Sequence, residues 1–273
     1  MLPLLFTLAN GLAADRITPT FAWAPGDVWA VSFERTSSRA AAGNAYTART
    51  TSNWTMTVSG TAAAIQVRAS DYKTAGTTGL PANDIKEGTN ANAAAAAPSF
   101  QLDAAGSIVE LVDAAVSRRS ADEWWDGLVR HWRGGALVRG QADNLALKTP
   151  LAQLGGREVQ NDASRVYEGP VPCAYGGAST CESFVLRSRL NPSDLAIAVA
   201  DHTRSVRASQ GGPPGMVVDS MAQDAILNLV TEADDLRPRR LNIERTTRVT
   251  GHVGKNVIES TQTETRTWTF ARR

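Results

Sequence analysis

The chain has 273 residues and a formal net charge of +1, from 28 Lys and Arg and 27 Asp and Glu side chains. A chain of this length can bury a substantial hydrophobic core in one domain. The balanced charge gives no electrostatic reason to expect binding to nucleic acid or to an anionic membrane surface. We therefore predict one domain whose function depends on particular side chains rather than on overall charge.

Residues 1–13 have the pattern of a signal peptide. An apolar run from Leu2 to Ala9 is followed by the small residues Gly11 and Ala13, placed as a signal peptidase requires. The run is too short to span a bilayer, and no other stretch reaches the roughly 20 apolar residues that a transmembrane helix needs. We predict that residues 14–273 form a single exported domain in the bacterial periplasm or outside the cell, without an integral membrane span.

Three segments near the N-terminus alternate apolar and polar residues, which is the period of a strand with one buried face. They lie at residues 27–36, 52–60 and 63–72, and in the second of them Trp54 and Met56 alternate with threonines. Turn-forming residues stand before the first segment and after the second. The pattern predicts an antiparallel meander.

The composition changes between residues 73 and 98. This segment is rich in Gly, Thr, Asn and Ala and lacks periodic apolar side chains, which predicts a long mobile loop. Alternation returns on both sides of Asp103 to Gly106, where the sequence DAAG predicts the turn of a hairpin.

The segment from Ser120 to Trp132, SADEWWDGLVRHW, is predicted to be an amphipathic helix. Ser120 and Glu123 have the spacing of a capping box, in which each side chain bonds a free backbone amide at the start of the helix. Trp124, Leu128 and Trp132 recur every four residues and form one apolar face. The tryptophans of this segment exceed what docking on a sheet requires, so one of them is a candidate to face a cavity.

The same helix carries four titratable side chains, which raises the alternative of an acid–base array: Asp122, Glu123, Asp126 and His131. A structural explanation is simpler. Carboxylates in the first turn favour the helix dipole, and Asp126 can pair with Arg130 four residues later. We therefore assign no catalytic residues to the helix.

Motifs for metals, cofactors and hydrolysis are weak or missing from the sequence. His131, His202 and His252 are far apart and lack the spacing of metal ligands. The adjacent acids Asp234 and Asp235 are typical of a turn. The sequence predicts no metal and no cofactor, and it favours a non-enzymatic protein, although a catalytic triad assembled from distant residues stays open.

The chain has two cysteines, Cys173 and Cys181, with two glycines between them. In an oxidising compartment this spacing predicts a disulfide that closes a short loop at the end of a hairpin. Two thiols without a nearby histidine or a second cysteine pair cannot complete a zinc site.

The remaining elements follow in chain order. Residues 182–190 predict a strand, and Asn191 followed by Pro192 predicts the start of a helix. Three strands end the chain, although the first also has the apolar pattern of a helix; their ranges are 225–231, 239–251 and 256–270. The last strand is expected to turn a polar ladder toward solvent, formed by Thr261, Thr263, Thr265 and Thr267.

Strands at both ends of the chain with helices between them predict an α+β fold: a strongly bent antiparallel β-sheet (half-barrel) with one or two helices covering the concave side. This layout includes the DAAG turn and a late acidic turn that leads through Pro238 into long strands. It resembles secreted bacterial β-rich proteins of unknown function with a lipoprotein-carrier-like (LolA/LppX-type) half-barrel. The resemblance implies a concave apolar surface that holds acyl chains, and it brings no catalytic residues with it.

Three functional hypotheses follow. The first is a non-enzymatic exported binding protein that holds an apolar or amphipathic, lipid-like ligand. Its candidate ligand-binding residues, for which core packing is the alternative role, are Trp54, Met56, Trp125 and Trp132. The second is an envelope protein with a structural role or with a protein partner that the sequence does not identify. The third is an exported hydrolase, which requires a histidine and a carboxylate or hydroxyl within hydrogen-bond reach in a cleft.

Overall fold

The structure is a computed structural model. It describes residues 16–41, 44–61, 64–78, 99–103, 106–112, 118–151, 154–173, 180–208, 217–232 and 235–273. The predicted signal peptide, residues 1–13, and residues 79–98 of the predicted loop lie outside the described residues.

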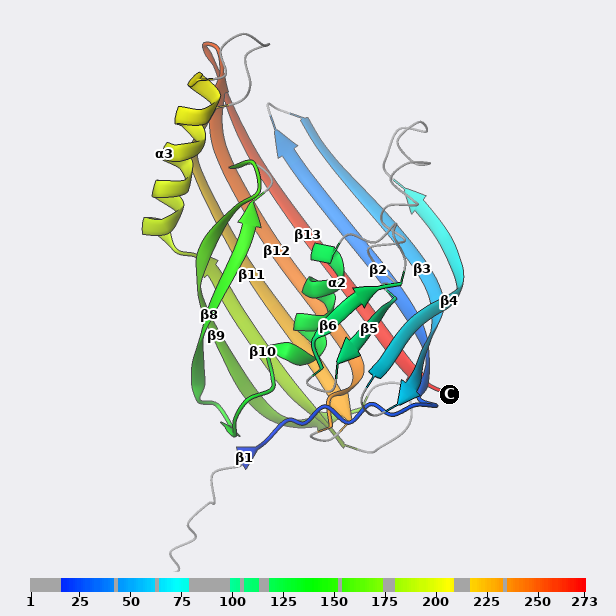
Figure 1. The fold of residues 1–273 in the computed structure, drawn as a ribbon. Helices are drawn as coiled ribbons and strands as arrows, with labels where there is room; N and C mark the ends of the chain where they lie inside the picture. Colours follow the sequence, from blue (N-terminus) through cyan, green and yellow to red (C-terminus); the bar gives the residue numbers. More distant parts are fainter. Residues whose placement is uncertain are drawn as a thin grey trace, which may run out of the picture.

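The described strands form one eleven-stranded antiparallel sheet with the order β6-β5-β4-β3-β2-β13-β12-β11-β10-β9-β8 (Figure 1). In chain order these strands are β2 (Val28–Ala41), β3 (Asn44–Thr61), β4 (Ala64–Thr78), β5 (Phe100–Asp103), β6 (Ile108–Leu111), β8 (Ala142–Leu151), β9 (Arg157–Pro172), β10 (Thr180–Leu190), β11 (Val217–Glu232), β12 (Arg237–Val253) and β13 (Asn256–Arg272). Two short strands, β1 (Arg16–Ile17) and β7 (Leu137–Val138), form a separate pair. The large sheet is open, with β6 and β8 at its edges.

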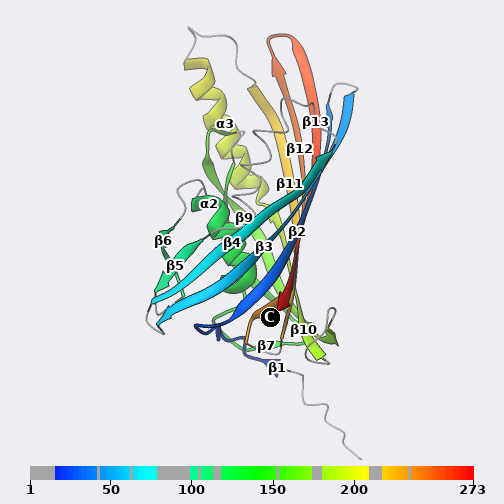
Figure 2. The same cartoon turned by 90° about the vertical axis from the view of Figure 1, so that its right-hand side faces the viewer.

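The N-terminal and C-terminal strands meet in the middle of the sheet. β2 pairs with β13 from Trp29 opposite Arg272 to Ala41 opposite Ser260. This pairing joins the meander β2–β4 to the strands β8–β13 in one layer, which bends around a concave side (Figure 1 and Figure 2). The predicted α+β fold with a bent antiparallel sheet is confirmed.

The helix predicted around the tryptophans lies on the concave side of the sheet (Figure 2). It consists of α2 (Arg118–Trp125) and a π-helical turn, η1 (Asp126–Arg130), in which the His131 amide donates to the Asp126 carbonyl five residues earlier. η1 packs on β11 and β12. Gly127 permits this close approach, because a β-carbon at that position would lie 3.0 Å from Leu227 Cδ1.

The second helix, α3 (Pro192–Ala208), begins as predicted. The Asn191 side chain caps it by accepting hydrogen bonds of 3.1 Å from the amides of Ser193 and Asp194. Its inner face packs on β9 and β11 through a buried cluster that includes Leu195, Ala198, Val159 and Met221. Met221, which α3 covers, and Leu227, which lies under η1, are six residues apart on β11 and therefore point to the same face of the sheet. α3 thus covers the same concave side as η1. None of the helices in the described ranges is long and apolar enough to cross a membrane.

The indoles of the tryptophan-rich segment are enclosed because protein covers them from two sides. The ring of Trp125 lies 5.4 Å from the rings of both Phe100 in β5 and Trp23 in the N-terminal segment. The ring of Trp132 lies 5.3 Å from that of Phe184 in β10. A helix that lay on the sheet alone would expose its outer indoles to water. The high tryptophan content therefore reflects a helix buried between the sheet and a second layer of chain.

Some element boundaries differ from those that the sequence pattern predicts. β4 continues to Thr78, where it pairs with Arg49 of β3, so the prediction that a loop begins at residue 73 is wrong. Backbone hydrogen bonds with β3 hold this segment in the sheet, although its sequence lacks the apolar alternation of a half-buried strand. β8 and β9 have no clear signal in the sequence, because the inward positions of β9 include Asn161 and Arg165 and interrupt the apolar alternation.

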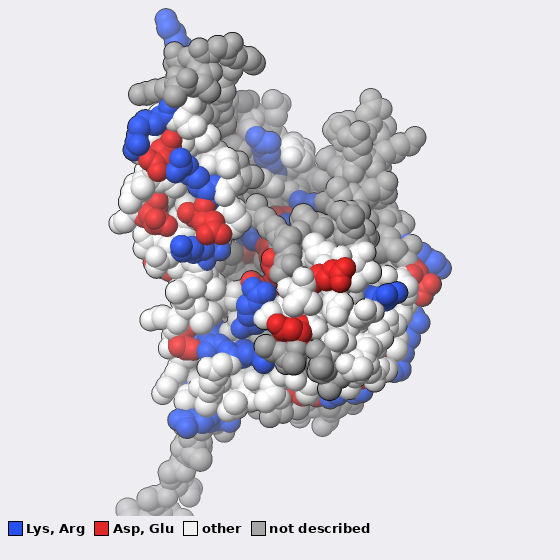
Figure 3. Space-filling model, viewed as in Figure 1, with Lys and Arg blue, Asp and Glu red and all other residues white. Residues whose placement is uncertain are grey.

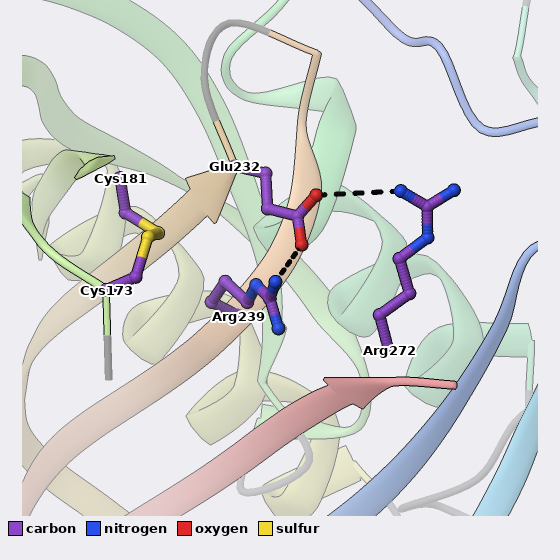
Figure 4. The surroundings of a disulfide bond; sticks show 5 residues. All are labelled: Cys173, Cys181, Glu232, Arg239 and Arg272. Atoms are coloured by element: carbon purple, nitrogen blue, oxygen red, sulfur yellow. Dashed lines mark ion pairs between the residues drawn. A yellow bond between two sulfur atoms is a disulfide. The ribbon is translucent and has the colours of Figure 1, made fainter. Parts of the chain in front are cut away.

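Cys173 and Cys181 form the predicted disulfide at the end of the β9–β10 hairpin, with their Cα atoms 5.1 Å apart (Figure 4). Cys181 stands opposite Glu232 of β11. The Glu232 carboxylate pairs with Arg239 and, at 3.8 Å, with Arg272 (Figure 4). This end of the sheet is therefore held by a covalent bond and by ion pairs between β11, β12 and β13.

Candidate functional site

The concave face of the sheet divides into two halves along its strands. In the lower half, which contains the disulfide end, most inward side chains are apolar, and in β2 they run from Trp29 to Phe33. In the upper half the alternation continues with polar side chains, beginning at Arg35. The inward side chains of β13 change from apolar to charged at the same level, between Trp268 and Arg266. The change falls at the same height on neighbouring strands and therefore forms a boundary across the sheet.

Five side chains at this boundary form a charged layer: Arg35, Arg245, Arg266, Glu264 and, from α2, Glu123. The register places Arg35 opposite Arg266, and Arg245 opposite Glu264. The Glu264 carboxylate lies 2.5 Å from Arg35 Nε and accepts hydrogen bonds of 3.0 Å from Arg266 Nε and Nη2. This bidentate geometry is the strong form of an arginine–carboxylate pair.

Glu123 is the side chain through which α2 reaches the arginines of the sheet. Its carboxylate accepts hydrogen bonds from Arg245 Nη2 and, at 3.1 Å, from Arg266 Nη1. Because α2 begins at Arg118, Glu123 does not stand at the third helical position that the capping box with Ser120 requires. The carboxylate that the sequence pattern assigns to the cap fixes the helix to the sheet.

Two members of the charged layer, Glu264 and Arg266, are stabilised in their ionised forms by their partners. Burial by itself raises the pKa of Glu264, but the guanidinium groups of Arg266 and Arg35 outweigh it and lower the pKa below its ordinary value. For Arg266, burial lowers the pKa, but Glu123 and Glu264 outweigh it and the pKa is raised. Both shifts favour the charged forms of the Glu264–Arg266 pair.

A polar layer follows the charged layer toward the upper end of the sheet. The register places Arg39 of β2, Gln262 of β13, Thr247 of β12 and Gln223 of β11 in one row across four strands. Thr247 Oγ1 donates to Gln223 Oε1 at 3.2 Å, and Arg39 Nε donates to Ser260 Oγ at 3.3 Å. These groups can donate and accept hydrogen bonds toward the concave side.

Beyond the polar layer the inward side chains become apolar again. Val249 of β12 stands opposite Met221 of β11, and Ile258 of β13 stands opposite Gly251. Val249 and Ile258 are half-buried. We call the two half-buried side chains, Val249 and Ile258, the apolar rim; Met221 beside them is covered by α3. On this side of the molecule, the surface is hollowed between the part formed by α3 and the part formed by β5 and β6, with acidic and basic atoms along the hollow (Figure 3).

The other titratable groups of the helix lie apart from the charged layer. Arg130 Nη1 lies 2.9 Å from Asp126 Oδ1, which confirms the predicted ion pair, and Arg130 Nη2 lies 3.6 Å from Asp122 Oδ1. Burial raises the pKa of Asp126 to about 6, although Arg130 opposes it. Burial, together with Arg130 and Arg165, lowers the pKa of His131 to about 4. The helix therefore does not aim its four acid–base groups at one point, as an acid–base array requires.

A buried arginine of β9 holds the end of this helix. Arg165 Nη1 donates to the carbonyl oxygens of His131, at 2.6 Å, and Arg133, at 2.9 Å. Its Nη2 lies 2.7 Å from the carboxylate of Asp143 on β8. Free carbonyl groups at a helix end carry partial negative charge, so a cation there stabilises the helix. Arg165 thus fixes the height of the helix above the sheet.

The four side chains predicted to contact a ligand lie in the lower half, in the hydrophobic core, and are at most 4 % exposed: Trp54, Met56, Trp125 and Trp132. Trp125 Nε1 donates to the Gly106 carbonyl at 2.8 Å, and Trp132 Nε1 donates to the Gly127 carbonyl at 2.7 Å. A ligand would reach these indoles by displacing protein side chains. Their role as ligand contacts stays a prediction, whereas their role in the core is visible in the structure.

Among the described residues, the histidine and the acidic turn that are relevant to hydrolysis or metal binding lie off the concave face. His252 Nδ1 lies 2.9 Å from Asp219 Oδ2, but His252 alternates out of step with the inward residues of β12 and is partly exposed. Asp235 lies in the predicted turn, where its carboxylate accepts from the Arg237 amide, and Asp234 lies outside the described residues. Within the described ranges, no group of three or more His, Cys, Asp or Glu side chains could hold a metal ion.

The sequence pattern alone does not identify the charged layer. A signal is nevertheless present, because the inward series of β2 continues from Phe33 to Arg35 without a break in period. The inward series of β13 likewise passes from Trp268 to Arg266 and Glu264. A charged residue at an inward position of a strand marks either a buried ion pair or a binding surface.

Comparison with known protein families finds no family model that matches the chain, and a search of curated proteins finds no similar protein.

Proposed function

We propose that the protein is an exported, non-enzymatic binding protein that holds an amphipathic ligand on the upper half of its concave face. The observation that supports this most is the order of the lining: the charged layer lies deepest, the polar layer follows, and the apolar rim of Val249 and Ile258 lies outermost. A ligand with one polar and one apolar end matches this order when its polar end points toward the charged layer.

The architecture also supports a binding function. The resemblance to lipoprotein-carrier-like proteins implies a ligand between a bent sheet and the helices on its concave side. In this chain α2 and η1 fill the lower half of that space with buried indoles. We therefore place the ligand in the upper half, where the filled lower half provides a rigid base for the site.

Export is part of the proposal. The disulfide between Cys173 and Cys181 supports it, because such bonds persist in oxidising compartments and are rare in the bacterial cytosol. The sequence of residues 1–13 supports it independently through its signal-peptide pattern.

The test compares two neighbouring residues of β13 that point to opposite faces of the sheet. Gln262 belongs to the polar layer, and Thr263 is exposed on the convex face. We expect Gln262→Trp to abolish ligand binding, because the indole occupies the proposed site, and Thr263→Trp to leave binding unchanged. Native mass spectrometry of the exported protein, after incubation with a lipid extract of the expression host, measures the bound fraction.

An adduct that is present on the wild type, lost in Gln262→Trp and kept in Thr263→Trp supports the proposal. The proposal is wrong if the wild type carries no adduct, or if both variants carry it to the same extent. Thermal unfolding of both variants shows whether either substitution has changed the fold itself.

A further inference from the structure

The charged and polar layers carry more positive than negative charge. Among their described residues, four guanidinium groups stand with two carboxylates: Arg35, Arg39, Arg245, Arg266, Glu123 and Glu264. The whole chain has a formal net charge of +1, so this excess of two positive charges is a local property of the two layers. A partly buried excess of one sign attracts ligands of the opposite sign more strongly than the same charges in water.

Arg39 contributes to this excess because it has no acidic partner. Its Nε donates to Ser260 Oγ at 3.3 Å, and none of the ion pairs between described residues includes it. The side chain is exposed in the polar layer, where a ligand from solvent can reach it. A guanidinium group can bind a carboxylate or a phosphate through two parallel N–H groups.

Arg245 and Arg266 are paired with a carboxylate that belongs to the helix rather than to the sheet. Glu123 of α2 accepts hydrogen bonds from both of them. Arg245 Nε is buried and has no hydrogen-bond partner among the described residues, so this guanidinium keeps an unused donor. An anionic ligand presents the same kind of acceptor oxygens as Glu123 and can therefore compete with it for the two arginines.

We propose that the ligand of the concave face has an anionic head group, a carboxylate or a phosphate, which Arg39 of the polar layer and Arg245 and Arg266 of the charged layer bind, the last two in competition with Glu123. This inference rests on the proposed function and adds the charge of the ligand to it. It assigns Arg39 to ligand selection, and it gives Glu123 a second role as the internal competitor of the head group.

The experiment uses amphiphiles with the same twelve-carbon chain and different head groups: dodecanoate, dodecyl phosphate, dodecanol and dodecyltrimethylammonium. Calorimetric titration of the full exported protein, below the concentration at which each compound forms micelles, measures the four dissociation constants. We expect the two anionic compounds to bind at least about tenfold more tightly than the neutral and the cationic ones.

Three variants identify the residues responsible. Arg39→Gln is expected to weaken dodecanoate binding about tenfold and to leave dodecanol binding unchanged. Glu123→Gln is expected to increase the preference for dodecanoate over dodecanol, because it removes the competing carboxylate. Arg49→Gln is the matched control, since Arg49 pairs with Glu34 on the convex face and is exposed. Arg49→Gln is expected to change neither the dissociation constant of dodecanoate nor that of dodecanol.

The outcomes separate this inference from the proposed function. If none of the four compounds binds, the proposed function fails and the inference fails with it. If dodecanol binds as tightly as dodecanoate, or if Arg39→Gln weakens both equally, the protein binds amphiphiles but the anionic head group is refuted. A Glu123→Gln variant that loses stability without any change in head-group preference would show that Glu123 has a structural role alone.

Discussion

The lower and upper halves of the concave face use the same strands and the same alternation, yet their inward side chains differ in kind. In the lower half, α2, η1, β5 and the N-terminal segment enclose those side chains, most of which are aromatic or aliphatic. In the upper half, α3 packs on β9 and β11, and the inward side chains of β2, β12 and β13 are charged or polar up to the apolar rim.

This difference separates two kinds of information in a strand. The period of two decides which face a side chain points to. The element that covers the face decides whether that side chain can be polar, because a buried polar group needs a partner and a hydrated one does not. The two halves should therefore respond differently to mutation and to pH.

The largest effect is expected in the lower half. Trp132→Ala should reduce the free energy of unfolding by about 3 to 5 kcal/mol, because the fully buried indole packs on Phe184 and its N–H donates to the Gly127 carbonyl. Urea unfolding measures this loss. Tyr46→Ala is the control, since Tyr46 is 46 % exposed and its removal should change stability by less than about 0.5 kcal/mol. Similar losses in the two variants would mean that the lower half is not the main core.

The next effect tests whether the charged layer is a buried network. Glu264→Gln should reduce the free energy of unfolding by about 3 kcal/mol at pH 7, because it leaves Arg35 and Arg266 without their shared carboxylate. The matched control is Glu34→Gln, which breaks an exposed pair with Arg49 on the convex face and should cost less than about 1 kcal/mol.

The pH dependence of the Glu264→Gln effect follows from the lowered pKa of Glu264. A carboxyl whose pKa is lowered by folding contributes stability above its ordinary value, here 4.5, and loses it as the pH falls through the lower folded value. The difference between the wild type and Glu264→Gln should therefore shrink in acid, as measured by urea unfolding at a series of pH values. A difference that stays constant down to the acid limit would contradict the assignment.

The last prediction concerns Asp126 in the helix between the two halves. Its contribution to stability changes with pH in the opposite direction to that of Glu264. Folding raises the pKa of Asp126 to about 6 through burial, so its contribution to stability is present below 3.8 and is lost as the pH rises through about 6. Asp126→Asn should therefore be more stable than the wild type at pH 8, by at most about 3 kcal/mol, and equal to it near pH 3. Thermal unfolding at both pH values measures this, with Asp122→Asn as control. Destabilisation by Asp126→Asn at pH 8 would show that the ion pair with Arg130 outweighs burial.

Most of the fold could be predicted because its elements have local signals. The half-buried strands β2, β3 and β11–β13 show the period of two, Asn191 and Pro192 mark the start of α3, and the cysteine spacing indicates the disulfide. β8 and β9 could not be predicted in the same way. The inward residues of β9 include Asn161 and Arg165, and Arg165 pairs with Asp143 of β8. These polar residues interrupt the apolar alternation, so the sequence shows no clear strand pattern there.

The candidate site could be predicted only in part. The sequence indicates a concave face and a tryptophan-rich helix over it, and the structure has both. The helix segment alone cannot show how many sides of its indoles are covered, because β5 and the N-terminal segment that enclose Trp125 are distant in the chain. The expectation of a cavity lined by indoles therefore depends on packing that no local pattern contains.

By itself, the sequence determined which side chains of each strand share a face, where α3 begins and which cysteines can join, because these properties depend on neighbours within a few residues. Only the tertiary structure decided that Glu123 meets Arg245 and Arg266, which lie 122 and 143 residues further along the chain. The physical reason is that alternation has the same period in every strand and carries no information about which strand becomes its neighbour. The order and register of the eleven strands set the charged layer, and with it the site.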